Sequence, residues 1–465
     1  EGWVDHAYIA AHTNGYEELA RHVADYTPRR VAEITGVDTA TLYRVAKAYG
    51  TARAGMIAWT MGVNHSTQGA ETVNAINNLA LLTGHIGREG ASPFSITGQC
   101  NAMGTREFGF TSSIPGYRKF ERAADREEIA RLWNVDASRI PQARGLSYPD
   151  MIQAAADGGI RGLWIIATNP VVSFPNQDLL RRAFANLEFL VVQDGFHPTP
   201  TSQAAHLVLP AAIWGEKEGT YTNSERRVGK ANKAVDPPGE ARSDFDIFLA
   251  LSEELGCREE LFAGWQGPRD AFEEMRVVSE GRLCDYSGMT YEAIEANGGL
   301  QWPYPRGSEP GQASRLYQDG RYQHADQRAK FFAVEWKPFD DQPDERYPFV
   351  LNTGRTVEHW HTRTKTAQVA ILERMAPNAW LEMNPRDARQ LSLQPHDRVT
   401  LISRRGTVAG VELRLTEIIA PGQLFMPFHF FETNVNEVTH DSFDPISREP
   451  NYKQCAVRVE LASGR

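Results

Sequence analysis

The hydrophobic and polar positions of the first half of the chain follow two alternating patterns. From residue 16 to residue 50, apolar residues recur at helical spacing among charged ones, which predicts a pair of short helices with Thr39 as a candidate N-cap. An apolar run at 54–62 then precedes a helical pattern at 70–83, and the same order recurs between 163 and 184. Each of these segments predicts a strand followed by a helix.

Two further apolar runs, at 189–192 and 207–209, extend this arrangement. Uninterrupted apolar strands that alternate with helices are typical of a parallel sheet covered on both faces. Ligands bind such sheets beyond the carboxyl ends of the strands. We therefore expect Met61, Asn169 and Asp194, which follow or end three of the runs, to contribute to a binding site.

The pattern changes in the second half of the chain. Between 264 and 345 Gly, Pro and charged residues predominate, which indicates an irregular connection. After Tyr347 the apolar runs become short, and Arg404-Arg405-Gly406 and Pro421-Gly422 look like turns. The runs lie at 349–351, 379–381, 399–402, 408–415, 424–426 and 456–461. They predict a β-rich C-terminal domain, which we interpret as a barrel.

A chain of 465 residues, 41% of them hydrophobic, is long enough for several cores. We expect the helical end of a preceding α/β domain at 1–50, an α/β domain at 51–263, the irregular connection at 264–345 and a β-barrel domain at 346–465. The formal charge is -10, with 59 acidic and 49 basic residues and no long basic run, which argues against nucleic acid as a partner.

No apolar stretch approaches the roughly 18 to 20 residues of a membrane helix, and the first residues are not a signal peptide. We therefore expect no membrane span and a cytoplasmic location. The four cysteines, Cys100, Cys257, Cys284 and Cys455, are widely separated and form no C-x-x-C pair. Within this chain we accordingly expect no metal ligands and no iron-sulfur cluster.

Three polar segments carry candidate chemistry. The segment 95–107 has two glycines, amides and Arg106 without a hydrophobic period, so it is a loop that can approach a ligand closely. A surface loop in which Arg106 pairs with a carboxylate is the alternative. The segment 214–227 combines charges with small polar residues, which a salt-bridged turn explains equally well.

The third segment, Thr353–Thr362, places two imidazoles, a guanidinium and hydroxyls after a strand. Such groups suit phosphate or pyrophosphate oxygens. His359 and His361 resemble half of a metal site, but no further ligands stand at a recognisable spacing, and a solvated turn is the other alternative. A plain nucleotide-binding protein has no support, because no G-x-G-x-x-G or Walker sequence is present.

The order of these segments resembles the molybdopterin-guanine-dinucleotide oxidoreductase family across essentially the whole chain. The matching motifs are Met61 to His65, Thr97 to Glu107, Asn169-Pro170, Gln193-Asp194, Glu216 to Gly219, Thr353 to Thr362 and Asn434 to Lys453. Within the family, the loop from Thr97 to Glu107 is most similar to that of the nitrate reductases, including the assimilatory catalytic subunits.

This resemblance implies α/β layers with parallel sheets and flanking helices, followed by a C-terminal β-barrel. It also implies a bis-molybdopterin guanine dinucleotide cofactor with molybdenum, and the two-electron reduction of nitrate to nitrite by oxygen-atom transfer. The 4Fe-4S cluster and the cysteine that ligates molybdenum are expected upstream of Glu1. Electrons would come from a donor such as ferredoxin, flavodoxin or a nicotinamide-linked reductase.

By the same resemblance, Met61, Gln99 and Arg106 would take part in catalysis near the molybdenum, with Arg106 holding the nitrate. The cofactor would contact Met61, His65, Gln99, Asn169, Gln193, Asp194, Lys217, Asp244, Thr353, Gly354, Arg355, Thr356, Val357, Glu358, His359, Trp360, His361, Thr362, Phe428, Asn436 and Lys453. Asp194 or Asp244 would accept guanine N–H groups, and Lys217 or Lys453 would neutralise phosphate. A formate dehydrogenase, another oxyanion reductase and a non-catalytic cofactor-binding subunit are the alternatives.

Overall fold

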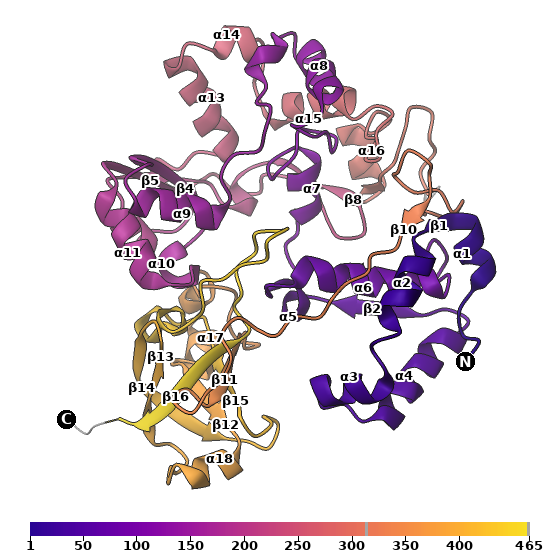
Figure 1. The fold of residues 1–465 in the computed structure, drawn as a ribbon. Helices are drawn as coiled ribbons and strands as arrows, with labels where there is room; N and C mark the ends of the chain where they lie inside the picture. The colour runs from indigo at the N-terminus through magenta and orange to yellow at the C-terminus, as the bar shows by residue number, and fades with distance from the viewer. Residues whose placement is uncertain (312–314, 463–465) are drawn as a thin grey trace. The chain divides into compact units, whose positions relative to one another are not determined.

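The computed structural model describes residues 1–311 and 315–462, which form two compact units (Figure 1). The first unit consists of Glu1–Gly98, Gly311–Pro338 and Asp444–Glu449, and the second of Gln99–Pro310, Phe339–Phe443 and Pro450–Arg465. All three domain boundaries expected from the sequence, after residues 50, 263 and 345, fall inside a unit.

The first unit is mainly helical. Its helices are α1 (His6–His12), α2 (Tyr16–Val23), α3 (Pro28–Thr35), α4 (Thr39–Thr51), α5 (Met61–Asn64) and α6 (Gly69–Leu82). The stretch 16–50 thus holds three helices rather than the expected pair, because Gly36, with φ +73°, ends α3. The N-cap of α4 is Asp38, whose carboxylate accepts a hydrogen bond from Thr41 N at 2.8 Å, and not Thr39.

Short parallel strand pairs complete the first unit. The strand β2 (Met56–Trp59) pairs with β3 (Ser92–Ser95), and β1 (Thr13–Asn14) pairs with β10 (Ala329–Lys330). The strand and helix predicted between residues 54 and 83 are therefore confirmed as β2 and α6. A small core gathers around Ile9, Leu19, Leu81 and Phe331.

The second unit contains a parallel sheet in the order β4 (Gly162–Ile166), β5 (Phe189–Asp194) and β6 (Leu207–Pro210). The helices α9 (Tyr148–Ala156) and α11 (Gln177–Asn186) bury Ile165 and Val192 on one face (Figure 1). On the other face, the ring of Trp164 lies 5.3 Å from that of Phe248 in α13 (Asp244–Glu254). The predicted parallel sheet with helices on both faces is confirmed. The short helices α10 (Pro170–Ser173) and α12 (Pro200–Gln203) follow β4 and β5.

The segment expected to be irregular, 264–345, contains two helices, and that expectation is wrong between residues 268 and 301. These are α15 (Pro268–Val278) and α16 (Tyr291–Ala296), followed by β9 (Leu300–Gln301). Buried Phe272, Met275 and Val278 form a helical stripe that the many surrounding charges hide in the sequence. The strand β9 pairs with β8 (Arg227–Ala231), which pairs with β7 (Gly219–Thr222).

The same part of the unit includes α7 (Ala102–Glu107), α8 (Ala123–Leu132) and α14 (Arg258–Leu261). Single 3-10 turns occur at η1 (Ala137–Arg139), η2 (Trp214–Glu216), η3 (Thr366–Gln368), η4 (Phe431–Thr433) and η5 (Val435–Glu437). Among the residues described, no helix combines the length and the apolar character needed to cross a lipid bilayer.

The C-terminal strands close into a barrel, as the sequence predicts. Its order is β11 (Phe349–Gly354), β15 (Gln423–Pro427), β12 (Trp380–Met383), β14 (Thr407–Leu415), β13 (Arg398–Ser403) and β16 (Cys455–Leu461). The six strands include the six predicted apolar runs, and alternate residues such as Leu351, Leu381 and Leu413 fill the core. The helices α17 (Ala370–Met375) and α18 (Pro385–Gln390) lie between strands along the chain.

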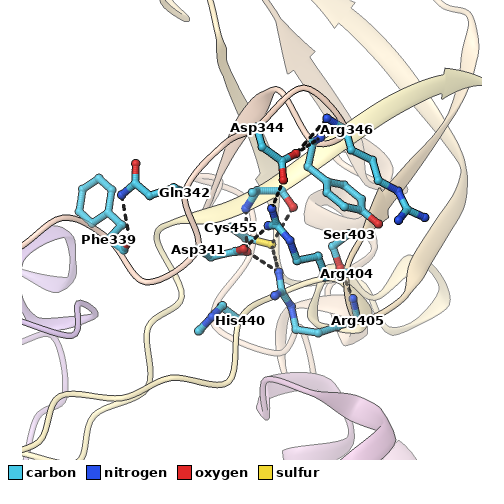
Figure 2. A network of polar contacts seen from close by, with 12 residues as sticks. Phe339, Asp341, Gln342, Asp344, Arg346, Ser403, Arg404, Arg405, His440 and Cys455 are labelled. Atoms are coloured by element: carbon cyan, nitrogen blue, oxygen red, sulfur yellow. Dashed lines mark hydrogen bonds and ion pairs between the residues drawn. The ribbon is translucent and has the colours of Figure 1, made fainter.

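The predicted turn between β13 and β14 binds the segment that leads into the barrel (Figure 2). Asp341 is buried and accepts hydrogen bonds from Arg405 Nη2 at 2.6 Å and from Ala456 N at 2.9 Å. Arg404 contacts both Asp341 and Asp344. The acidic stretch 340–345, part of the expected irregular connection, is thus attached to the barrel through Asp341 and Asp344.

Candidate functional site

Several of the predicted residues meet where the strands of the parallel sheet end. Gln193 is fully buried at the end of β5, and its Nε2 donates to Asp244 Oδ1 at 2.7 Å. The ammonium of Lys217 pairs with the other carboxylate oxygen of Asp244. Three of the predicted residues are therefore in contact, and the charge of Lys217 is balanced by Asp244 rather than left for a phosphate.

The neighbouring carboxylate, Asp194, has fewer partners. Burial raises its pKa, and its Oδ1 accepts a hydrogen bond from Phe196 N at 3.0 Å. No side chain of the described residues donates a hydrogen bond to this carboxylate, and its further neighbours are the backbone of Gly195 and the charge of Lys365. This carboxylate can therefore accept N–H groups of a ligand at the end of β5.

Asn169 connects the end of β4 to the loop that follows β11. Its Oδ1 accepts from Thr201 Oγ1 at 2.6 Å, and its Nδ2 lies 3.5 Å from Thr364 Oγ1. A cavity of about 520 Å³ lies between these elements. Its walls come from Asn169, the loop 195–200, the loop 362–368 and residues 429–432. The sheet end and the barrel loops thus share one cavity inside the second unit.

Two cations lie on the barrel side without acidic partners. Lys453 is half-buried and donates to the carbonyl oxygen of Thr353, and burial lowers the pKa of Lys453 to about 8. The guanidinium of Arg355 lies 5.2 Å from the ring centre of Trp360 and 5.8 Å from that of Phe428. Within the described ranges neither cation forms an ion pair with a carboxylate. Two neighbouring charges that lack a counter-charge favour the binding of an anion.

His429 belongs to this cluster, although the sequence did not single it out. Its Nε2 accepts from Thr356 N at 2.9 Å, so its Nδ1 carries the proton and donates to His361 O at 2.5 Å. Burial lowers the pKa of His429 to about 4, which keeps the ring neutral. The sequence feature that could have indicated His429 is the aromatic run at residues 428–430, directly after β15.

The hydrogen-bonding groups of other predicted residues already have partners within the protein. Both ring nitrogens of His359 have partners, Thr366 Oγ1 at 3.0 Å and Ala376 O at 2.7 Å. The amide of Asn436 donates to Val172 O at 2.7 Å and accepts from Thr439 Oγ1 at 2.9 Å. Structural roles account for these two side chains. Of the remaining predicted residues, Gly354 ends β11, and Val357, Glu358 and Thr362 follow the strand, with Val357 94% exposed.

Three buried polar atoms near these groups have no hydrogen-bond partner. They are Gln193 Oε1, Thr356 Oγ1 and Arg363 Nη1, and Arg363 lines the cavity. A buried polar atom without a partner costs roughly 1–3 kcal/mol. A ligand rich in donors and acceptors, such as a pterin dinucleotide, would satisfy such atoms, so the residues present fit this cofactor. Arg363 was not predicted, because the sequence alone does not distinguish it from the other arginines of the chain, and only its position in the fold does.

The segment 95–107, expected to be a loop, ends in the helix α7, which places Arg106 on the surface of the second unit. The guanidinium lies 3.9 Å from Met103 Sδ and forms no ion pair within residues 1–311 and 315–462. The carboxylate partner that the salt-bridge alternative requires is therefore not found among these residues. Gln99 is exposed in the same segment.

Two predicted residues lie in the first unit. Met61 begins α5, and His65 follows its end, with Nε2 2.9 Å from Glu449 Oε1. Across the residues that the structure describes, no group of three His, Cys, Asp or Glu side chains is arranged to hold a metal ion.

A parallel sheet whose strand ends share a cavity with a closed barrel, beside cations that lack counter-charges, suits a protein that binds a large anionic ligand. Sequence comparison defines the family. The profile described as Molybdopterin oxidoreductase matches residues 9–254, and that of the Molydopterin dinucleotide binding domain matches residues 349–456. The chain belongs to the molybdopterin oxidoreductase family.

Similar proteins carry two different activities in their names. The chain is 39% identical to a nitrate reductase of Synechocystis sp., covering 98% of this chain and 65% of that protein. It is 38% identical to the F420-dependent formate dehydrogenase subunit alpha of Methanocaldococcus jannaschii, covering 99% and 66%. The chain therefore spans about two thirds of the length of the curated relatives it matches.

A solved structure with the same fold is acetylene hydratase from Pelobacter acetylenicus. The TM-score is 0.75 at 17% identity, and the match covers 99% of this chain and 68% of that chain. This likeness confirms the mixed α/β architecture with a C-terminal barrel.

Proposed function

We propose that this chain is the larger part of a molybdenum-dependent nitrate reductase. The observation that carries the proposal is Arg106, an exposed guanidinium without an acidic partner in the described ranges, in a loop similar to that of the nitrate reductases. A planar guanidinium can donate two parallel hydrogen bonds to a planar anion such as nitrate. The relative from Synechocystis, which is named a nitrate reductase, supports the same proposal.

In this proposal the second unit holds the bis-molybdopterin guanine dinucleotide. Arg355 and Lys453 neutralise phosphate oxygens, since both lack a carboxylate partner within the described residues. Asp194 and the buried Gln193 Oε1 accept N–H groups of the guanine. Lys217 supports this end of the site through Asp244 rather than by direct contact with phosphate.

The reaction converts nitrate, two electrons and two protons into nitrite and water. The bound molybdenum cofactor supplies the two-electron redox chemistry. In this proposal Arg106 binds and orients the anion. Its charge also stabilises negative charge on the substrate oxygens during the reaction.

The remaining third of the relatives' length is where this proposal places the 4Fe-4S cluster and the protein ligand of molybdenum. The electron donor would be ferredoxin, flavodoxin or a nicotinamide-linked reductase. Gln99 is proposed to border the reacting centre together with Arg106.

Formate oxidation is the second candidate, because the relative from Methanocaldococcus jannaschii is named a formate dehydrogenase subunit and is nearly as similar. Formate is also a small planar monoanion, so an unpaired arginine suits it equally. The two candidates differ in the direction of electron flow and share the same anion-binding requirement.

The test uses the chain within its complete natural polypeptide. Molybdenum and pterin content are measured, followed by nitrite formation with reduced viologen and by formate oxidation with an oxidised dye. We expect bound molybdenum and nitrite formation. Formate turnover without nitrite formation would transfer the proposal to formate oxidation, and the absence of bound molybdenum and pterin would favour a subunit without catalytic function.

A further inference from the structure

A carboxylate is buried directly beside Arg106. Glu107 ends α7, and its side chain is fully buried. Its carboxylate accepts a hydrogen bond from Trp302 Nε1 at 2.6 Å and another from the hydroxyl of Tyr286. Glutamate is almost never fully buried unless it is paired, yet within the described residues no cation forms an ion pair with Glu107. Burial raises the pKa of Glu107 in spite of these hydrogen bonds, so a carboxyl group at this position calls for a specific explanation.

The hydrogen bonds of Glu107 anchor α7 to two other segments. The hydroxyl of Tyr286 also lies 2.7 Å from Thr222 Oγ1, which belongs to β7. At the other end of the helix, Asn101 Oδ1 accepts from Thr222 N at 2.9 Å. The six-residue helix is thus fixed at both ends by side chains that reach the same strand, either directly or through Tyr286.

This arrangement determines where Arg106 points. Successive residues of a helix project about 100° apart, so a side chain fixed inward at position 107 directs position 106 toward the surface. A helix of one or two turns is not stable by itself, and its orientation depends on such contacts. We propose that Glu107 is a positioning residue, which through Tyr286 and Trp302 holds Arg106 toward a small planar monoanion such as nitrate or formate. The inference rests on the proposed role of Arg106.

Three variants of the complete polypeptide separate positioning from general stability. Tyr286→Phe removes the hydrogen bond between these two residues, and Glu107→Gln leaves one acceptor oxygen for the two donors, Tyr286 and Trp302, with side chains of nearly the same size. Glu128→Gln is the matched control, because Glu128 lies on α8 and pairs with the buried guanidinium of Arg118 at 2.9 Å rather than with a side chain of α7. All variants are compared at equal molybdenum content.

We expect Glu107→Gln and Tyr286→Phe to raise the KM for nitrate, or for formate if formate is the substrate, about three- to tenfold with kcat within about twofold. The effects of the two substitutions are expected to be less than additive in the double variant, since both act on the contact between Glu107 and Tyr286. Hydrogen exchange of the backbone amides of residues 105–109 is expected to accelerate in both variants and to stay unchanged in Glu128→Gln.

Unchanged exchange at residues 105–109 in both variants would overturn the inference, whatever the activity. So would a KM effect in Glu128→Gln as large as that in Glu107→Gln, which would indicate a general effect of stability. Arg106→Ala is measured in parallel. If that variant binds and turns over substrate normally, the proposed role of Arg106 fails; if it is impaired while the other two are not, only the inference about Glu107 fails.

Discussion

The buried aspartate that attaches residues 339–346 to the barrel offers a stability prediction with a defined magnitude. In Asp341→Ala, the amide of Ala456 loses its acceptor, and Arg405 keeps only Val438 O and Cys455 Sγ as neighbours (Figure 2). Both partners of the ion pair are poorly exposed: the side chain of Arg405 is 15% exposed and that of Asp341 is 4% exposed.

Removing one partner of a buried ion pair costs roughly 3–5 kcal/mol. Arg404, the second cation, is 36% exposed and can turn to solvent, so we take the lower end, about 3 kcal/mol. The matched control is Asp344→Ala, which also contacts Arg404 but is half-exposed. We expect a clearly smaller loss from this control, because exposed ion pairs contribute little.

Hydrogen exchange of the Ala456 amide and its neighbours in β16 measures this effect locally, which matters because two units need not unfold together. A loss of about 3 kcal/mol corresponds to opening that is more than a hundredfold more frequent. Equal exchange rates in Asp341→Ala and Asp344→Ala would refute the argument that burial decides the contribution.

The pH dependence of the Asp341 contribution has a defined sign. Burial raises the pKa of Asp341, but the hydrogen bond from Ala456 N and the charge of Arg405 outweigh this, so its pKa lies below the ordinary value. A carboxyl group with a lowered pKa in the folded state contributes stability above its unfolded pKa, about 3.9, and loses it as the pH falls through the folded value. The difference between wild type and Asp341→Ala should therefore be constant above about pH 5 and shrink below about pH 4.

Three further predictions concern the anion sites and the barrel turn. Arg106→Lys should raise the KM for nitrate in the complete polypeptide with molybdenum and pterin content unchanged, and an equal loss of both would indicate a structural role. Because the pKa of Lys453 is about 8, calorimetry should show pyrophosphate binding that weakens between about pH 7 and 9, and Lys453→Arg should remove this dependence. Gly406→Ala should destabilise the barrel by about 1–3 kcal/mol in thermal unfolding, since the added methyl would clash with the carbonyl oxygen of Glu437, whereas Gly145→Ala, which meets open space, should not.

The barrel could be predicted from the sequence because its signal is local. In β11 and β13 the buried residues alternate with less buried ones, and the two predicted turns carry glycine or proline. The helix α15 was missed because its buried stripe of three residues lies among charges that resemble a linker. Local hydrophobic patterns therefore predict a helix or strand well only where the surrounding sequence is not dense in charged and polar residues.

The contacts of the site lay beyond such patterns. The contact of Asn169 with Thr364 joins distant segments, and the partnership of Glu107 with Tyr286 and Trp302 joins three. No periodicity predicts either contact. The motif resemblance placed Gln193, Lys217 and Asp244 in one site, but it could not indicate that Lys217 and Asp244 pair with each other.

Charge pairing bears on the proposed anion sites. The chain carries 59 acidic and 49 basic residues, and many of its surface arginines pair with a carboxylate, as Arg161 and Arg181 do. Arg106, Arg355 and Lys453 form no ion pair within the described residues. In an acidic protein, positive potential develops where cations are kept apart from carboxylates, and small anions are attracted to such places. The proposed anion binding therefore depends on the positions of these three cations rather than on the net charge.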